Sequence, residues 1–90
     1  MKSNPYLNKA IANILHRRRM ELSMSKKKLS EKSSITRIHI SDIEEGNKNP
    51  TVNAVFSLCE ALQLNMNDFT RLVQEEMSQL KENDTNTQDI

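Results

Sequence analysis

The sequence predicts an all-α protein, and three observations support this prediction. The chain of 90 residues contains one glycine and two prolines, too few for an architecture of strands and tight turns. Apolar residues recur at spacings of three and four, which is the period of one face of an amphipathic helix. Side chains that favour helix N-caps precede these apolar stretches and divide the chain into short helices. The candidate caps are Ser25, Thr36, Thr51 and Asn65.

The first predicted helix covers about residues 9–22 and follows an N-terminal arm of residues 1–8. A basic run, Arg17-Arg18-Arg19, winds around this helix, so its three side chains cannot all be solvated in the same way. The buried side of the helix is marked by Ile11, Ile14 and Leu15. In so short a chain we expect residues 9–81 to form a single domain with a small core.

Residues 25–50 are predicted to form a helix-turn-helix followed by a polar loop, and the rest of the chain is interpreted as its scaffold. The two helices cover residues 26–32 and 37–45 and are separated by a Ser-Ser turn. Gly46 comes directly after the second helix, where a residue tolerant of positive φ is favoured. The apolar positions that fold the two helices together are Leu29, Ile35, Ile40 and Ile43.

Three consecutive lysines, Lys26, Lys27 and Lys28, form the first turn of the helix at residues 26–32. Cations beside the positive end of a helix dipole are unfavourable by roughly a few tenths of a kcal/mol each. A bound phosphate reverses this sign, because a helix N-terminus also points N–H groups outward. The alternative is an ordinary solvated charge run. We interpret the lysines as part of an anion site suited to the DNA backbone.

Two further helices are predicted over about residues 52–62 and 66–81, followed by a disordered acidic tail of residues 82–90. The first of them is expected to supply most of the core through Val52, Val55, Phe56, Leu58, Cys59 and Leu62. Its cysteine is therefore expected to be a buried, inert thiol rather than a redox sensor. The second carries an apolar stripe made of Met66, Phe69, Leu72, Val73, Met77 and Leu80.

The far half of this stripe, Val73, Met77 and Leu80, extends further than one small domain needs. We expect these three residues to form a homodimer interface. The alternative is that they only cover the core of their own protomer.

The spaced pattern over about residues 11–69 resembles the Xre family, which includes the phage repressors and Cro proteins. This resemblance implies a five-helix, lambda-repressor-like domain whose third helix enters the DNA major groove, usually in a dimer that reads two half-sites. The matching positions are Arg19, Met24, Ser25, Leu29, Ile35, Thr36, Ile40, Ile43-Glu44-Glu45-Gly46, Asn49-Pro50, Leu62 and Leu64. The sequence departs from the family at Lys26, where many members have glutamine, and at Ser34, where glycine is usual.

The resemblance and the helix register assign roles to individual residues. An ion pair between Arg19 and Glu44 is expected to tie the first helix to the recognition helix. Arg37 is the leading candidate for a base contact, since a guanidinium can grip both acceptors on the major-groove edge of guanine. The residues expected to read bases are Arg37, Ile38, Ser41 and Asp42. The residues expected to contact phosphates are Ser25, Lys26, Lys27, Lys28, Thr36, His39, Asn47 and Lys48.

Charge is distributed unevenly along the chain, although the net charge is only +1. Residues 1–37 hold ten Lys or Arg against two acids, and residues 38–90 hold three against ten. This asymmetry predicts a basic contact face and an acidic remainder. The acidic character of the recognition helix, from Asp42, Glu44 and Glu45, is the strongest argument against ordinary DNA binding.

The sequence predicts a transcriptional regulator, favouring a repressor, that binds a palindromic operator in double-stranded DNA as a homodimer. The alternatives are a protein-binding module of the same fold, such as an antitoxin or antirepressor with a protein partner, and a restriction-modification controller. A single cysteine and the absence of His-Glu-x-x-His or glycine-loop motifs predict no enzyme, no metal and no cofactor. The absence of a signal peptide or a long apolar run predicts a cytoplasmic protein with no membrane role.

Overall fold

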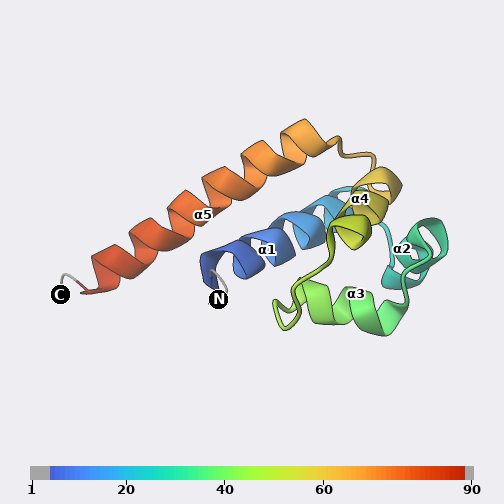
Figure 1. Cartoon of the computed structure of the whole chain (residues 1–90), viewed down its shortest axis with the longest axis horizontal. Helices are drawn as coiled ribbons and strands as arrows, with labels where there is room; N and C mark the ends of the chain where they lie inside the picture. The colour runs from blue at the N-terminus through green and yellow to red at the C-terminus, as the bar shows by residue number, and fades with distance from the viewer. Residues whose placement is uncertain (1–4, 89–90) are drawn as a thin grey trace.

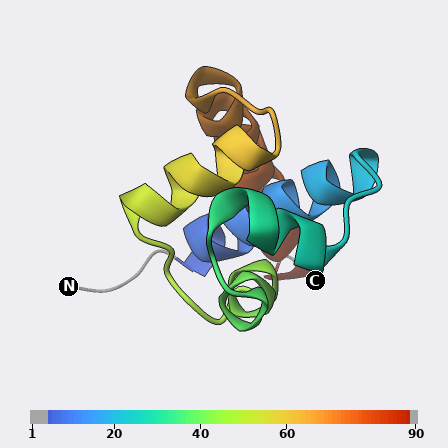
Figure 2. The same ribbon diagram turned by 90° about the vertical axis from the view of Figure 1, so that its right-hand side faces the viewer.

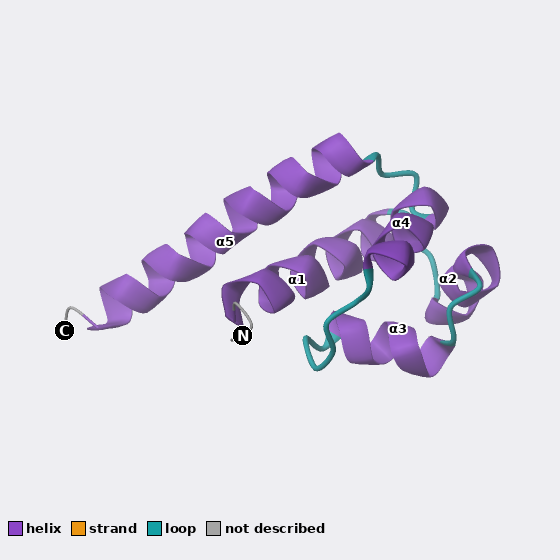
Figure 3. Cartoon of the chain, viewed as in Figure 1, coloured by secondary structure: helices purple, strands orange, loops and turns teal. Residues whose placement is uncertain are grey.

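The computed structural model describes residues 5–88, with side chains described up to residue 84. Within this part of the chain the secondary structure is entirely α-helical, as predicted (Figure 3). The helices are α1 (Pro5–Glu21), α2 (Lys26–Ser33), α3 (Arg37–Glu44), α4 (Val52–Ala61) and α5 (Met66–Gln88) (Figure 1).

Helix α1 forms the centre of the arrangement. It packs along α5 on one side and against α3 on the other (Figure 1). Helix α2 packs against both α3 and α4, which places α2 and α3 together at one end of the molecule (Figure 2). The side chains buried between the helices are Ala10, Ile14, Leu15, Leu29, Ile40, Ile43, Val55, Leu58, Cys59, Leu62, Phe69 and Val73. Because all five helices contribute to this one core, α3 is held rigidly at the surface.

Four side chains cap the N-termini of α2 to α5, and all four were predicted from the sequence. In each case a side-chain oxygen accepts a backbone N–H of the first turn, which has no partner within the helix. Ser25 accepts from Lys28 N at 3.0 Å and Thr36 from His39 N at 3.2 Å. Thr51 accepts from Ala54 N and Asn65 from Asp68 N.

The C-terminus of α3 is closed by Gly46, whose φ is +78°. The N–H of Gly46 donates to the carbonyl of Ile43, and that of Asn47 donates to the carbonyl of Asp42, both at 3.0 Å. These two bonds satisfy carbonyls that the end of the helix leaves open, and they require the left-handed backbone that glycine adopts at little cost. The helix ends at Glu44, one residue earlier than predicted.

The turn between α2 and α3 contains a serine in a left-handed conformation. Ser34 has φ 63° and ψ 24°, and its N–H donates to the carbonyl of Ser30 at 2.9 Å. The turn therefore keeps its tight geometry, although Ser34 replaces the glycine usual in the family.

Both ends of the chain differ from the sequence-based boundaries. Helix α1 begins at Pro5, so residues 5–8 of the predicted arm are helical; proline suits a first helical position, where its missing N–H would have no partner. Helix α5 continues to Gln88 through most of the predicted disordered tail, in a stretch without glycine or proline. Tyr6 Oη donates to Asp84 Oδ2 at 2.6 Å and joins these two extensions. Residues 1–4 of the predicted arm and 89–90 of the predicted tail lie outside the described part.

Helix α4 contributes less to the core than predicted. Val55, Leu58, Cys59 and Leu62 are buried, but Val52 and Phe56 are 71% and 54% exposed. These two residues are one turn apart, so they share the face of α4 that turns away from the core. Burial raises the pKa of the Cys59 thiol to about 11, in keeping with the predicted inert cysteine.

The stripe on α5 packs against the protein's own core, which was the alternative to a dimer interface. Val73 is only 5% exposed, and Met77 and Leu80 are partly buried against the same core. Glu76 strengthens this packing, because its carboxylate accepts from Asn13 at 2.8 Å and from Arg17 at 3.1 Å, both on α1. All three residues are therefore engaged within the protomer, and their role in a dimer interface stays a prediction.

Candidate nucleic-acid interface

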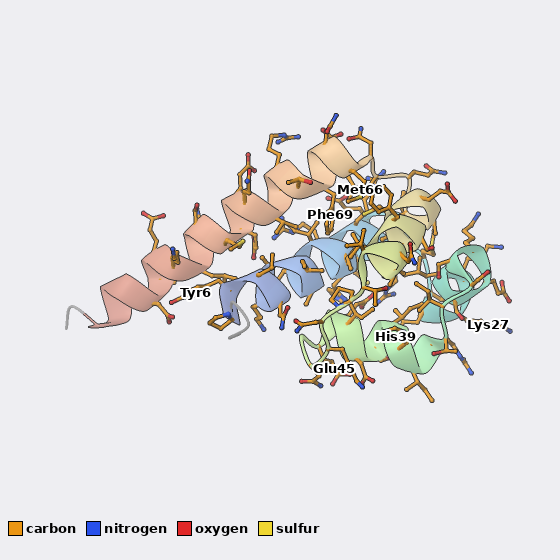
Figure 4. The ribbon with its side chains drawn as sticks, viewed as in Figure 1. Tyr6, Lys27, His39, Glu45, Met66 and Phe69 are labelled. Carbon is orange, nitrogen blue, oxygen red and sulfur yellow. The ribbon has the colours of Figure 1, made fainter. Side chains whose placement is uncertain are left out.

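A shallow hollow of about 670 Å³ lies where the N-terminal parts of α2 and α3 meet. Its lining combines cationic, hydroxyl and apolar side chains, namely Arg19, Ser25, Lys26, Lys27, Arg37, Ile38 and Ser41. The fold thus brings together members of both predicted groups, the base readers and the phosphate contacts. Figure 4 shows Lys27 on α2 and His39 on α3 at this end of the molecule, far from Tyr6.

The outer face of α3 carries the residues predicted to read bases. Arg37 is exposed at the first position of the helix, and Ile38 is 78% exposed. Ser41 and Asp42 follow one turn later and are half-buried. Exposure of an apolar isoleucine to water does not stabilise the fold, but in the major groove the side chain can contact the methyl group of thymine.

Side chains predicted to contact phosphates lie at both ends of α3. Lys27 and Lys28 are exposed beside the N-terminus of α2, and Asn47 and Lys48 are exposed in the loop after α3. The second group follows the C-terminal end of α3, a helix of eight residues that is about 12 Å long at 1.5 Å per residue. Ser25 and Thr36 use their hydroxyl oxygens as helix caps, and His39 is half-buried on α3. The structure therefore does not gather all predicted phosphate contacts in the hollow.

Arg19 and Glu44 form a nearly buried ion pair between α1 and the end of α3. Arg19 Nε donates to Glu44 Oε2 at 2.8 Å, and Nη2 donates to Oε1 at 3.0 Å. The two side chains are 8% and 5% exposed. Arg19 Nη1 also donates to the carbonyl of Met24 at 2.8 Å, so the guanidinium ties α3 to the segment before α2 as well.

Glu44 has a second partner, His16, which the sequence analysis did not include. His16 Nδ1 lies 2.9 Å from Glu44 Oε1. Burial alone would raise the pKa of Glu44, but the hydrogen bonds from Arg19 and His16 and the charge of Arg19 hold that pKa below its ordinary value. A signal for His16 was present in the sequence, since it lies one turn before Arg19 on the same face of α1.

The internal position of Glu44 changes the electrostatics of the recognition helix. Its carboxylate is paired and turned toward α1, which leaves the half-buried Asp42 and the exposed Glu45, at the C-cap of α3, as the other acids. The argument against DNA binding that rests on three acidic residues is weakened accordingly. In the same region, Lys26 Nζ donates to Ser41 Oγ at 3.1 Å, a contact between α2 and α3 that the sequence did not predict.

Among the residues with described side chains, no group of three or more His, Cys, Asp or Glu is arranged to hold a metal ion. None of the described helices combines the length and the apolar composition needed to cross a membrane.

These features define a helix-turn-helix protein with a rigidly held recognition helix and a cationic margin. A family model described as helix-turn-helix matches residues 15–69, and the chain belongs to this family. The match covers α2, α3 and α4 completely and the ends of α1 and α5 that pack around them. Comparison with curated proteins gives no match.

The fold is similar to those of several solved structures. The clp gene regulator ClgR from Corynebacterium glutamicum aligns with a TM-score of 0.85 at 21% identity, over 91% of this chain and 87% of that chain. A single-residue mutant of the restriction-modification controller protein C.Esp1396I aligns with a TM-score of 0.76 at 25% identity, over 86% and 95%. The tetramer of that controller in complex with its natural 35 base-pair operator aligns with a TM-score of 0.75 at 24% identity, over 79% and 93%.

Proposed function

We propose that this protein is a sequence-specific DNA-binding transcriptional regulator that inserts α3 into the major groove. The observation that carries the proposal is the hollow between α2 and α3, where the exposed Arg37 and Ile38 of the recognition helix lie beside the lysines of α2. Charged donors and an exposed apolar side chain on one rigid helix suit a base edge flanked by phosphates. The proposal is a binding function and not catalysis, because the family and the solved neighbours are regulators.

Base readout is assigned to the outer face of α3. Arg37 donates to the two acceptors of a guanine, and Ile38 contacts a thymine methyl. Ser41 donates to or accepts from a neighbouring base, and Asp42 accepts from a cytosine amine. Each of these contacts depends on the orientation of α3, which the Arg19–Glu44 pair fixes relative to α1.

Phosphate contacts are assigned to the margins of that face. Lys27 and Lys28, with the N-terminus of α2, approach one backbone strand, and Asn47 and Lys48 approach the other side of the groove. Ser25 caps α2 beside these lysines, Thr36 and His39 lie at the start of α3, and the three complete the contact to the backbone. These interactions position the protein without reading sequence, so they make binding dependent on salt.

We further propose that the protein binds a palindromic operator as a homodimer whose contact is on α4. The exposed Val52 and Phe56 lie on one face of α4, and Phe56 also borders a second hollow of about 290 Å³ whose lining is mixed polar and apolar. A surface with two exposed apolar side chains can pair with its own copy across a two-fold axis. Two subunits joined in this way present two recognition helices to two half-sites.

We propose a repressor that acts in the cytoplasm, because the family that the sequence resembles includes the phage repressors and a dimer bound at an operator can block transcription. The narrower role of restriction-modification controller is favoured by one observation. The C.Esp1396I mutant aligns at 25% identity over 86% of this chain and 95% of its own chain.

Selection of bound fragments from a random duplex pool tests the proposed function. Wild type and Arg37→Ala are compared at two salt concentrations, with Arg71→Ala as a control because Arg71 is exposed on α5, away from the interface. We expect a two-fold symmetric consensus for wild type and for the control. In Arg37→Ala the preference at one position of each half-site should weaken by about 1–3 kcal/mol.

The alternative outcomes separate the competing interpretations. Salt-sensitive binding without a consensus would show that the protein contacts phosphates and does not read bases. Absence of binding would refute the proposal and favour the protein-partner module, such as an antitoxin.

A further inference from the structure

Lys26 differs from the other two lysines of α2 in the position of its ammonium group. Its Nζ donates to the Oγ of Ser41 on α3 at 3.1 Å, in a partly buried contact. Lys27 and Lys28 are exposed. The side chain of Lys26 therefore lies across the junction between α2 and the recognition helix, whereas its two neighbours extend from α2 into solvent.

The hydrogen-bonding capacity of this pair follows from its chemistry. A lysine ammonium has three donors and no acceptor, so the Ser41 oxygen must be the acceptor in the bond. The hydroxyl hydrogen of Ser41 then points away from Lys26, and two ammonium hydrogens remain. The pair thus presents a hydroxyl donor beside ammonium donors, and the Lys26 ammonium carries its one positive charge.

This donor pair lies among the base readers. Lys26 and Ser41 line the same hollow as Arg37 and Ile38, the two exposed residues at the start of α3. The proposed phosphate contacts Asn47 and Lys48, in contrast, are in the loop beyond the other end of the helix. The hydrogen bond to Ser41 therefore holds the Lys26 ammonium on the face of α3 that would meet base edges.

We propose that Lys26 and Ser41 act as one donor unit that reads a guanine in the major groove. Guanine presents two acceptors there, N7 and O6, whereas cytosine presents a donor, which the donor unit would repel. Lys26 is then a specificity-determining residue and not a phosphate contact, since contacts to phosphates carry no sequence information. This inference rests on the proposed function, and it deepens it by naming a base and the two residues that read it.

The test is the same fragment selection, applied to Lys26→Met, Ser41→Ala and the double variant. Lys27→Met is the matched control, because it removes the same charge from the same turn of α2 without touching α3. We expect Lys26→Met and Ser41→Ala to lose preference for guanine at the same position of each half-site, on the order of tenfold. The double variant should lose little more than either single variant, because the two side chains act as a unit. Lys27→Met should bind more weakly to all sequences and keep the wild-type consensus.

The outcomes distinguish this inference from the proposed function. If Lys26→Met weakens binding to all sequences equally, as Lys27→Met does, Lys26 is a phosphate contact and the inference is wrong while the proposed function stands. If the wild type selects no consensus, the proposed function itself fails. Far-UV circular dichroism monitors folding, and Ser41→Ala tests the same position if Lys26→Met does not fold, since alanine is favourable on an outer helix face.

Discussion

Arg19 on α1 donates two hydrogen bonds, 2.8 and 3.0 Å long, to the carboxylate of Glu44 on α3. The pair is almost fully buried and joins the central helix of the core to the last turn of the recognition helix. Arg19 also holds the carbonyl of Met24, in the segment that leads into α2. One guanidinium therefore sets the position of both helices that form the proposed DNA-binding face.

Loss of one partner of the Arg19–Glu44 pair should lower the free energy of unfolding far more than replacement of both partners. Arg19→Met leaves the Glu44 carboxylate buried without its main partner, so we expect the free energy of unfolding to fall by about 3–5 kcal/mol. Replacement of both by apolar residues, Arg19→Met with Glu44→Leu, should recover much of this loss. Urea denaturation of the single and double variants measures both effects.

Arg17→Met serves as the control for this comparison. Arg17 also pairs with a carboxylate across helices, but its side chain is 53% exposed, so its removal should cost less than about 1 kcal/mol. Equal losses for Arg19→Met and Arg17→Met would show that the buried pair has no special role.

The contribution of Glu44 to stability should disappear in acid. Although burial opposes it, hydrogen bonds from Arg19 and His16 keep the pKa of Glu44 below the ordinary 4.5. A carboxyl group whose folded pKa is lowered stabilises the fold above its unfolded pKa, and this stabilisation is lost as the pH falls through the folded pKa. We expect wild type to exceed Glu44→Gln in stability by a constant amount near neutral pH and by a shrinking amount below pH 4.5.

Urea unfolding of both proteins across this pH range provides the measurement. Glu75→Gln is the control, because the Glu75 side chain is 61% exposed and its removal should have little effect at any pH. A stability gap that stays unchanged into acid would show that the charge of Glu44 is not its source.

The fold was largely predictable from local chemistry, because α2 to α5 begin where the sequence predicts. Ser25, Thr36, Thr51 and Asn65 each accept an N–H of the first turn, as expected from their side chains. The outer boundaries were predicted less well, and the two extensions are joined by a contact between the two ends of the chain. Tyr6 and Asp84 are 78 residues apart in the sequence, and no local pattern indicates that they meet.

Which apolar residues face the core was harder to predict than where the helices lie. Val52 and Phe56 were assigned to the core by their hydrophobicity, but the buried face of α4 is occupied by Val55, Leu58 and Cys59. The length of the stripe on α5 predicts an interface, whereas within the protomer the stripe packs against the core along α1, which begins at Pro5. The hydropathy pattern shows which face of a helix is apolar, but it does not show what that face packs against.

The sequence predicted many of the residues of the candidate site, but it predicted less well which of them contact one another. Helix register placed Arg37 and Ile38 on the outer face of α3, where the structure has them exposed. The contacts of Lys26 with Ser41 and of His16 with Glu44 join residues from different helices. Such pairings depend on how the helices pack, which spacing within one helix cannot reveal.

The turn of the helix-turn-helix offers a stabilising substitution. Ser34 has a φ of 63°, a conformation that is unfavourable for residues with a side chain and readily adopted by glycine. Ser34→Gly should raise the free energy of unfolding by up to about 1 kcal/mol, as measured by urea denaturation. Ser34→Ala separates conformation from loss of the hydroxyl, since alanine keeps the strain and should give no gain. A gain in both variants would point to the hydroxyl rather than the backbone.

We propose a dimer contact on α4, at its exposed residues Val52 and Phe56. Phe56 is 54% exposed on α4, so Phe56→Asp should leave the protomer folded while it places a charge in the proposed interface. A two-fold interface contains two copies of Phe56, each worth about 1.5–3 kcal/mol when buried. Their loss should weaken dimerisation on the order of 100-fold or more, which sedimentation velocity detects as conversion to monomer.

Met77→Asp tests the interface that was first expected on α5. Met77 is partly buried against the core of its own protomer, so the charge should destabilise the fold by about 2 kcal/mol or more and leave the folded fraction dimeric. Gln74→Asp adds the same charge at an exposed position of α5 and should change neither property. The proposed contact on α4 is wrong if Phe56→Asp sediments as a dimer while Met77→Asp sediments as a folded monomer. The dimer contact would then be on α5.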